Sequence, residues 1–252
     1  MAPAGYGNRV EGIHSVAAAA AGGRVRKLWV EERRLGRSEI AGIVEAVGRE
    51  KTSPVRDVGP MAETEAPQGI VADCDPIMPT PVDELGGPGA ALVVLDHIED
   101  PQNVGAIARS ALAAGMTGMV VSSRRAAPLS ATAFKAAAGA LETLPVSIVG
   151  SVPEALSRLK YRGIWIVGLE AGSARSLFGL DLFTEPVAVV VGAEGAGLSV
   201  LSAKRCDVLA SIPMAASFES LNASVSAALA CFEIMRVRTE FDPSLQSDVP
   251  PG

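Results

Sequence analysis

From Ala91 onward the chain alternates short apolar runs with longer stretches of helical pattern, and this alternation constrains the fold most strongly. The runs Ala91–Leu95 (ALVVL) and Val187–Val191 (VAVVV) are entirely hydrophobic. Further predicted strands are Gly118–Val121, Pro145–Val149, Gly163–Gly168 and Val208–Ser211. The predicted helices between and after them are Val104–Ala114, Ser130–Leu141, Val152–Leu159, Ser199–Cys206 and Ser220–Glu240. Buried strands alternating with helices predict an α/β fold, with a parallel sheet covered by helices on both faces.

A small α/β unit is predicted before this region. We expect two helices and two strands, at Gly12–Ala21, Arg37–Arg49, Lys27–Val30 and Gly69–Asp73. The segment DPIMPTPVDELGGPGA that follows is rich in Pro and Gly and has no periodicity, which is typical of a linker. The predicted organisation is a small domain at 1–74, a linker at 75–90, a large domain at 91–240 and a disordered tail at 241–252.

Composition excludes several classes of protein. The three cysteines, Cys74, Cys206 and Cys231, are widely spaced and have no histidine cluster nearby. This spacing argues against a zinc site and against a disulfide scaffold, so we predict no metal and expect three small buried side chains. The sequence has neither an apolar run long enough to cross a bilayer nor a secretory signal. We therefore expect a soluble, cytoplasmic protein.

The distribution of charge is more informative than the net charge of −6. Basic residues gather near the N-terminus, at Arg24, Arg26, Lys27, Arg33 and Arg34. A local basic patch on an acidic protein suits a specific RNA contact better than general adhesion to nucleic acid. On charge alone, a solvated surface explains the cluster equally well.

Three loops that follow predicted strands concentrate the polar residues, and ligands of such sheets bind beyond the carboxyl ends of the strands. The first is LDHIEDPQNVGAIARSALAAG, residues 95–115. Arg109 lies within a mostly apolar stretch, where an arginine needs an anion or a carboxylate. Asn103, six residues earlier, is a second candidate. The alternative is that Asn103 caps the helix and Arg109 is an ordinary surface residue.

The second loop, VAVVVGAEGAGLS, places one carboxylate, Glu194, among Gly192, Gly195 and Gly197. Glycines permit positive φ and close approach of the backbone to a ligand. The spacing GxxGxG does not match the GxGxxG of dinucleotide-binding loops. Alone, this loop is equally well explained as a tight turn.

The third loop, SIPMAASFESLNASVSAALACFE, leads from a strand into a helix of small residues. Ser220 is the predicted N-cap of that helix.

Together, DPQNVGAIARSALAAG, VVVGAEGAGLS and SIPM…SLNASVSAALACFE resemble the three motifs of the SpoU/TrmH family of RNA ribose 2′-O-methyltransferases, within the SPOUT superfamily. The resemblance covers residues 91–240. EGIHSV and PQGIVA are similar to the RNA-binding domain that precedes the catalytic domain in the ribosomal-RNA branch. The resemblance implies a C-terminal trefoil knot, a homodimer, S-adenosylmethionine as methyl donor, and a guanosine ribose of large-subunit ribosomal RNA as substrate.

By motif position, the resemblance also implies roles for individual residues. The donor would be contacted mainly through the backbone of Gly192, Ile212 and Leu221, with Met214 and Asn222 lining the same pocket. Arg109 would be the central catalytic side chain, supported by Asn103, Glu194, Ser220 and Asn222. Arg109 either removes the proton of the hydroxyl, helped by an RNA phosphate, or holds the phosphate and stabilises oxyanion charge.

This chain departs from the family after IPM, where a glycine is usual and Ala216, Phe218 and Glu219 occur.

Three other functions compete with this interpretation. The substrate could be transfer RNA, or the chain could be an RNA-binding relative without activity. A nicotinamide-dependent enzyme would need an acidic residue about twenty positions after the glycines, and Asp207 is only a partial match. His97 is interpreted as a loop residue because the sequence offers it no matching partner.

Overall fold

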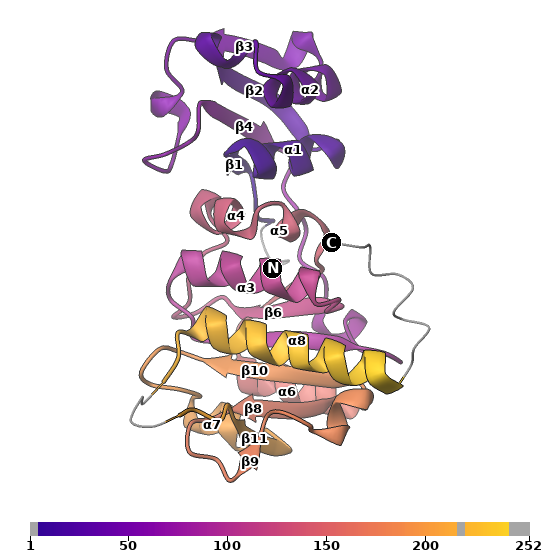
Figure 1. Ribbon diagram of the computed structural model, residues 1–252. Helices are drawn as coiled ribbons and strands as arrows, with labels where there is room; N and C mark the ends of the chain where they lie inside the picture. Colours follow the sequence, from indigo (N-terminus) through magenta and orange to yellow (C-terminus); the bar gives the residue numbers. More distant parts are fainter. Residues whose placement is uncertain (1–4, 216–219, 242–252) are drawn as a thin grey trace. The chain divides into compact units, whose positions relative to one another are not determined.

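Seven parallel strands form the larger of two sheets in the computed structural model, which describes residues 5–215 and 220–241 (Figure 1). The strand order is β7-β6-β5-β10-β8-β11-β9, and every pairing is parallel. The strands are β5 Ala91–Asp96, β6 Gly118–Ser122, β7 Val146–Val149, β8 Trp165–Leu169, β9 Arg175–Ser176, β10 Val187–Gly192 and β11 Val208–Ser211. All six predicted strands are present and the parallel sheet is confirmed. Only the two-residue β9 was missed.

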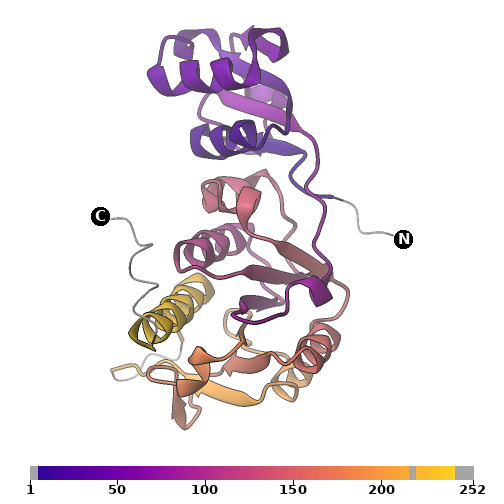
Figure 2. The same ribbon diagram turned by 90° about the vertical axis from the view of Figure 1, so that its right-hand side faces the viewer.

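Helices cover both faces of this sheet. Helix α8 (Ala223–Phe241) packs on β10 and β5, and α6 (Val152–Tyr161) packs on β8 and β5 from the opposite side (Figure 2). The inward face of α6 follows helical periodicity, because Val152, Ala155 and Leu156 are buried while polar residues lie between them. Strands β5 and β10 are buried on both faces, which explains their uninterrupted apolar sequence.

The remaining predicted helices have changed bounds. Helix α3 spans Pro101–Ala113 and α7 spans only Val200–Ala203. The helix predicted at Ser130–Leu141 is divided into α4 (Ala131–Ala137) and α5 (Ala140–Thr143). The break is a left-handed backbone at Ala138 and Gly139, with φ of 49° and 98°. Beyond Phe241, the last residue of α8, the predicted tail lies outside the described residues.

The smaller sheet has four strands in the order β1-β4-β2-β3. Strand β4 is antiparallel to β1 and β2, whereas β3 is parallel to β2. The strands and helices of this region are β1 Arg9–Glu11, α1 Ile13–Ala21, β2 Val25–Glu31, α2 Ser38–Val47, β3 Thr52–Val55 and β4 Ile70–Cys74. The sequence predicted β2, β4 and both helices. It missed the three-residue β1, and it missed β3 because Pro54 removes a backbone donor, which an edge strand tolerates.

The two sheets belong to different compact units, each built from several stretches of chain. Unit 1 comprises Met1–Pro79, Pro101–Arg109 and Ala127–Thr143, and unit 2 comprises Thr80–Asp100, Ser110–Ala126 and Leu144–Gly252. Short 3-10 helices connect the elements at η1 Glu32–Arg34, η2 Arg49–Lys51, η3 Gly59–Met61, η4 Val82–Glu84 and η5 Asp181–Thr184. Among the described residues, no helix combines the length and hydrophobicity that crossing a bilayer requires.

Candidate functional site

A pocket of about 240 Å³ opens in unit 2 where three neighbouring strands end. Its lining residues come from the segments that follow β8, β10 and β11 and from the beginning of α8. Because β8, β10 and β11 run parallel, their carboxyl ends lie at one edge of the sheet. The pocket therefore lies beyond the carboxyl ends of the strands, where the sequence predicted that a ligand binds.

The loop after β10 is a tight turn that admits only glycine at its first position. The backbone N–H groups of Ala193 and Gly197 each donate to the carbonyl of the other, at 3.1 and 2.9 Å. A Cβ on Gly192 would lie 2.1 Å from the carbonyl carbon of Gly197, which is closer than atoms can approach. Gly195 and Gly197 have φ of 75° and 66°, as expected for glycines in such a turn. The expected positive φ is present at Gly195 and Gly197, and the approach of this backbone to a ligand stays a prediction.

Glu194 and Asn222 join this loop to α8. The side-chain amide of Asn222 donates to Oε1 of Glu194 at 2.5 Å. Oδ1 of Asn222 accepts from the backbone N–H groups of Ser224 (2.8 Å) and Val225 (3.3 Å). These contacts make Asn222 the N-cap of α8, so the predicted cap at Ser220 is wrong. The helix begins at Ala223, two residues later than that prediction requires.

Six of the predicted site residues are brought together by the pocket. Its lining includes Gly192, Glu194, Ile212, Met214, Ser220 and Leu221. Ala216, Phe218 and Glu219, where this chain departs from the family pattern, lie outside the described residues.

Of the other three residues predicted for catalysis or donor binding, Asn222 contacts the pocket residue Glu194 but is not part of the lining, and Asn103 and Arg109 lie on α3, in unit 1. Asn103 is buried in the first turn of α3, which begins at Pro101, so Asn103 does not cap the helix. Arg109 is exposed. Its apolar neighbours Ile107 and Ala108 are buried on the other side of the helix, so they do not force the arginine to pair with an anion. The apolar flanks therefore do not support a role for Arg109, and its role remains a prediction.

Asp96 is a buried carboxylate that the sequence analysis missed. It is the last residue of β5, pairs in register with Gly192, and has no exposed surface. Its Oδ2 accepts a hydrogen bond from the backbone N–H of Ser199 at 2.8 Å, just after the segment from Gly192 to Gly197, which we call the glycine loop. Its Oδ1 lies 2.8 Å from Nδ1 of His97, which gives His97 the partner that the sequence did not reveal. The sequence feature that could have indicated Asp96 is a single carboxylate directly after the apolar run Ala91–Leu95.

Most of the basic residues predicted to bind RNA make ion pairs within unit 1. Arg24 donates to both carboxylate oxygens of the buried Glu142, at 2.7 and 2.6 Å. Arg26 pairs with Asp75. Arg33 and Arg34 share the carboxylate of Glu31. The pKa of Glu31 is lowered mainly by the hydrogen bond from Arg33, and Arg34 lowers it further. Lys27 instead lies over the ring of Trp29, with Nζ 5.0 Å from the ring centroid.

The cysteines are unsuited to nucleophilic chemistry. Burial raises the pKa of Cys74, Cys206 and Cys231 to about 12 in each case. A thiol with such a pKa remains protonated near neutral pH. Cys74 and Cys231 are buried as predicted, and Cys206 is half-buried.

Comparison with known proteins gives matches over most of the chain. A family model described as the SpoU rRNA Methylase family matches residues 90–232. An uncharacterized tRNA/rRNA methyltransferase of Synechocystis sp. is 48% identical over 154 residues, which are 61% of this chain and 40% of that protein. The 23S rRNA (guanosine-2′-O-)-methyltransferase RlmB of Pseudomonas aeruginosa is 36% identical over 250 residues, which are 93% of this chain and 98% of that protein.

These relatives differ in how much of their length the chain spans. Besides the 40% of the Synechocystis protein, it spans 61% and 63% of two further relatives. Among solved structures, the SpoU methyltransferase AviRb from Streptomyces viridochromogenes in complex with the cofactor AdoMet has a TM-score of 0.79 and 27% identity. That match covers 92% of this chain and 90% of the other.

Proposed function

Because the chain belongs to the SpoU rRNA Methylase family, we propose that it transfers the methyl group of S-adenosylmethionine to a ribose 2′-hydroxyl of RNA. The observation that carries the proposal is the pocket at the carboxyl ends of β8, β10 and β11, which unites six residues of the family's motifs. The solved AviRb structure with AdoMet supports the choice of donor.

The proposed fold includes a C-terminal trefoil knot, with domains at 1–74 and 91–240 joined by residues 75–90. Two observations support the knot. Strand β10 lies between β5 and β8, so the order of strands in the sheet differs from their order in the chain. The chain then continues through β11 into α8, which packs back on β10 and β5. We assign RNA binding to the small domain.

The donor is held by Gly192, Ile212, Met214, Leu221 and Asn222 in this proposal. The missing side chain at Gly192 fits this assignment, because it brings two stretches of backbone together at the pocket wall. When bound, the sulfonium supplies an electrophilic methyl group. The hydrogen bond from Asn222 to Glu194 keeps the start of α8 next to the glycine loop, so both sides of the pocket keep their positions.

Arg109 is the central catalytic residue of the proposal. A guanidinium group stays protonated in proteins, so we assign to Arg109 the binding of an RNA phosphate and the stabilisation of negative charge on the 2′-oxygen. Its exposed side chain suits contact with RNA. Asn103, Glu194, Ser220 and Asn222 support it, and alignment of the reactants supplies up to about 7–11 kcal/mol of the barrier reduction.

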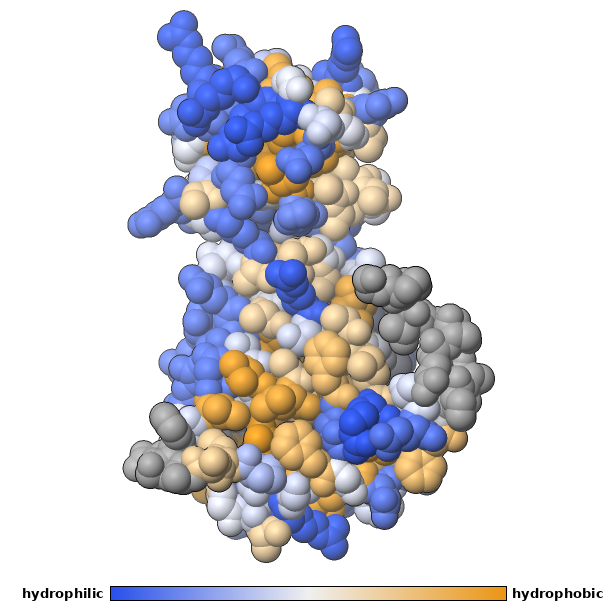
Figure 3. All heavy atoms as spheres, viewed as in Figure 1, coloured by the Kyte–Doolittle hydropathy of each residue, from blue (hydrophilic) through white to orange (hydrophobic). Residues whose placement is uncertain are grey.

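We further propose a homodimer that forms through α8. The outward-facing residues Val225 and Phe232 of α8 are 46% and 42% exposed and lie seven residues apart, on one face of the helix. Figure 3 shows hydrophobic surface along this face of unit 2, interrupted by one hydrophilic area. Exposed apolar surface of this kind marks an interaction site.

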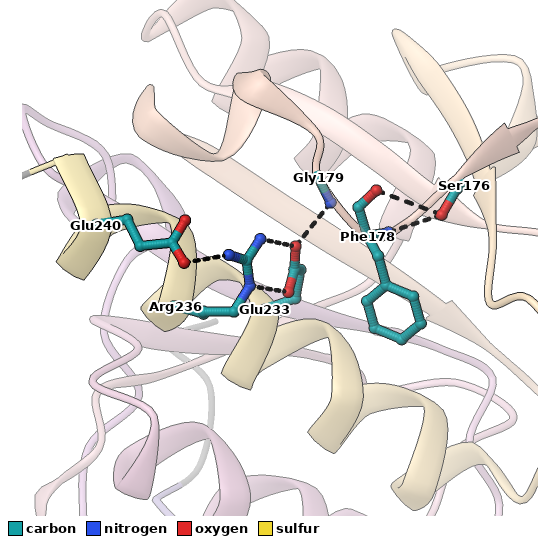
Figure 4. Close-up of polar contacts among 6 residues, drawn as sticks. All are labelled: Ser176, Phe178, Gly179, Glu233, Arg236 and Glu240. Atoms are coloured by element: carbon teal, nitrogen blue, oxygen red, sulfur yellow. Dashed lines mark hydrogen bonds and ion pairs between the residues drawn. The ribbon is translucent and has the colours of Figure 1, made fainter.

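Contacts of Glu233 hold this face in place (Figure 4). The buried carboxylate of Glu233 accepts from Arg236 and from the backbone N–H of Gly179, which fixes α8 to the segment after β9. Phe178, in that segment, is 44% exposed and extends the apolar surface. The dimer is tested by light scattering of Phe232→Glu, for which we expect a monomer.

A guanosine ribose of large-subunit ribosomal RNA is the proposed substrate. The Pseudomonas aeruginosa relative, named for that reaction, matches nearly the whole chain. Transfer RNA is the second candidate, because the Synechocystis relative is named for both RNA classes. The free cysteines suit a cytoplasmic location.

One experiment on the cell and one on the protein test the function. Mapping of 2′-O-methylation across cellular RNA, with and without the gene, should reveal the loss of one ribosomal mark. Purified Arg109→Ala should lose turnover while calorimetry shows unchanged donor affinity, and Arg162→Ala, another exposed arginine, should behave as wild type. Wild-type protein that binds no donor would instead support an RNA-binding relative without activity.

A further inference from the structure

The two faces of the four-stranded sheet carry different side chains. Side chains alternate between the faces along each strand. Val10, Ala72 and Leu28 lie in register on β1, β4 and β2, and none has exposed surface. Helices α1 and α2 pack against each other and against these strands, and thus cover this face.

The alternate positions form a polar row on the opposite face. Arg9 and Lys27 both pair in register with Asp73, and Trp29 occupies the next row, between Val71 on β4 and Ser53 on β3. Val71 and Glu11, the β1 residue of that row, have no exposed surface. Lys27 is exposed, while Arg9, Trp29 and Ser53 are half-buried. The two cations flank the indole, with the guanidinium carbon of Arg9 5.3 Å and Nζ of Lys27 5.0 Å from the ring centroid. We call Arg9, Lys27, Trp29 and Asp73 the Trp29 platform.

The two cations of the platform differ in how they are held. Arg9 is fixed, because Asp73 pairs with its guanidinium at 2.8 Å and the carbonyl of Met61 accepts a hydrogen bond from it. Lys27 has no carboxylate partner among the residues that the structure describes. Lys51, also exposed, donates to the carbonyl of Val25 at the start of β2. These two rows also contain two carboxylates, Asp73 and the buried Glu11, so Arg9, Lys27 and Lys51 outnumber them by one.

We propose that the Trp29 platform binds an unpaired nucleotide of the RNA substrate, whose base stacks on the indole in the place that Lys27 now occupies and whose phosphate contacts the displaced Lys27. The inference rests on the proposed function and names the part of unit 1 that recognises RNA. A half-exposed aromatic ring framed by cations suits a base, because every base has a stacking surface and a phosphate beside it. The nucleotide is unpaired because bases within a duplex already stack on their neighbours.

The fluorescence of Trp29 reports the contact directly. The chain has two tryptophans, and Trp165→Phe leaves Trp29 as the only one. We expect a hairpin RNA with an unpaired loop to quench this fluorescence saturably, and a blunt duplex of equal length to quench it much less. In the same background, Lys27→Ala should weaken hairpin binding about fivefold or more and lower the salt slope by about one. Lys204→Ala, which removes an exposed lysine of unit 2, should change neither.

Substitution of Trp29 itself adds a second readout. Loss of one stacked base corresponds to at least about fivefold weaker binding, which we expect for Trp29→Ala, whereas Trp29→Phe keeps most of the affinity. Circular dichroism checks that both variants are folded, and Lys27→Ala carries the test if Trp29→Ala is not.

If the hairpin binds without quenching Trp29, and Lys27→Ala binds it as tightly, the nucleotide does not bind at the Trp29 platform. This result leaves the proposed methyl transfer intact. Quenching in a protein that binds no donor keeps the platform and overturns the methyltransferase. Absence of any RNA binding overturns both.

Discussion

The seven-stranded sheet of unit 2 and the four-stranded sheet of unit 1 use their surfaces in opposite ways. Strands β5 and β10 are buried on both faces, and the pocket of unit 2 is built from loops beyond the strand ends. In unit 1 only one face is fully apolar, and the other carries Arg9, Lys27 and Trp29. A sheet that is apolar on both faces leaves its ends for chemistry, whereas a sheet with a polar second face offers part of that face.

This difference also separates two roles for arginine in unit 1. Arg24 is directed inward to Glu142, and only 13% and 4% of the two side chains are exposed. Arg9 lies on the polar face of the sheet, where its guanidinium flanks Trp29. Proximity in the sequence grouped Arg24 with the RNA-binding candidates, but its contacts are those of an internal support.

Arg24→Ala gives the largest effect that we expect. Removing one partner of a buried ion pair leaves Glu142 charged and without its arginine, which costs about 3–5 kcal/mol of unfolding free energy. Urea denaturation measures it. Arg33→Ala is the matched control, because the Arg33 side chain is 74% exposed and Arg34 still pairs with Glu31 in its absence, so we expect a loss of about 0–1 kcal/mol. Unchanged stability of Arg24→Ala, with weaker RNA binding, would return Arg24 to the RNA interface.

Gly192→Ala tests whether the pocket of unit 2 depends on backbone approach. The new Cβ would overlap the backbone of Gly197 and Leu198, so the loop must open. We expect donor affinity to fall at least about 100-fold, or about 2.8 kcal/mol, measured by calorimetry. Gly150→Ala is the control, because a Cβ there meets no atom within 4 Å. Wild-type affinity of Gly192→Ala would separate the donor site from this loop.

The sequence predicted unit 2 better than unit 1 for a physical reason. A strand buried on both faces is apolar at every position, as in Ala91–Asp96, and it is recognised without knowledge of its neighbours. The loops that follow such strands are then the obvious candidates for the site, and Glu194 was singled out in this way. The residue-level roles came from the family resemblance, since charge and periodicity alone left a tight turn equally acceptable.

What the sequence could not give depends on contacts between distant positions. Trp29 and Arg9 are twenty residues apart, and only the pairing of β1 and β2 with β4 brings them together. Asp96 meets Ser199 across 103 residues. Asn222 replaced Ser220 as the cap because both residue types suit an N-cap, and the choice depends on where α8 begins. Local patterns do not contain this information.

Glu233→Gln tests how the stability that this ion pair gives to unit 2 depends on pH. Hydrogen bonds from Arg236 lower the pKa of Glu233 below its ordinary value of 4.5. A lowered carboxyl pKa stabilises the fold above the unfolded-state pKa, and this stabilisation is lost as the pH falls through the folded-state value. We expect Glu233→Gln to cost about 1.5 kcal/mol near neutral pH and progressively less in acid, measured by urea denaturation at each pH. A constant difference across this range would contradict the assigned role of the charge.

The smallest effect is expected at Asn222, which joins the loop and the helix at the pocket of unit 2. Asn222→Ala removes the cap of α8 and the hydrogen bond to Glu194, whereas Asn222→Ser keeps a capping oxygen but cannot donate from an amide to Glu194. Loss of the cap costs about 1 kcal/mol of stability, so thermal denaturation should distinguish Ala from Ser. Donor affinity should fall equally in both variants if the link to Glu194 positions the loop. If Asn222→Ser retains full donor affinity, the cap of α8 positions the pocket, and the hydrogen bond to Glu194 is not needed for donor binding.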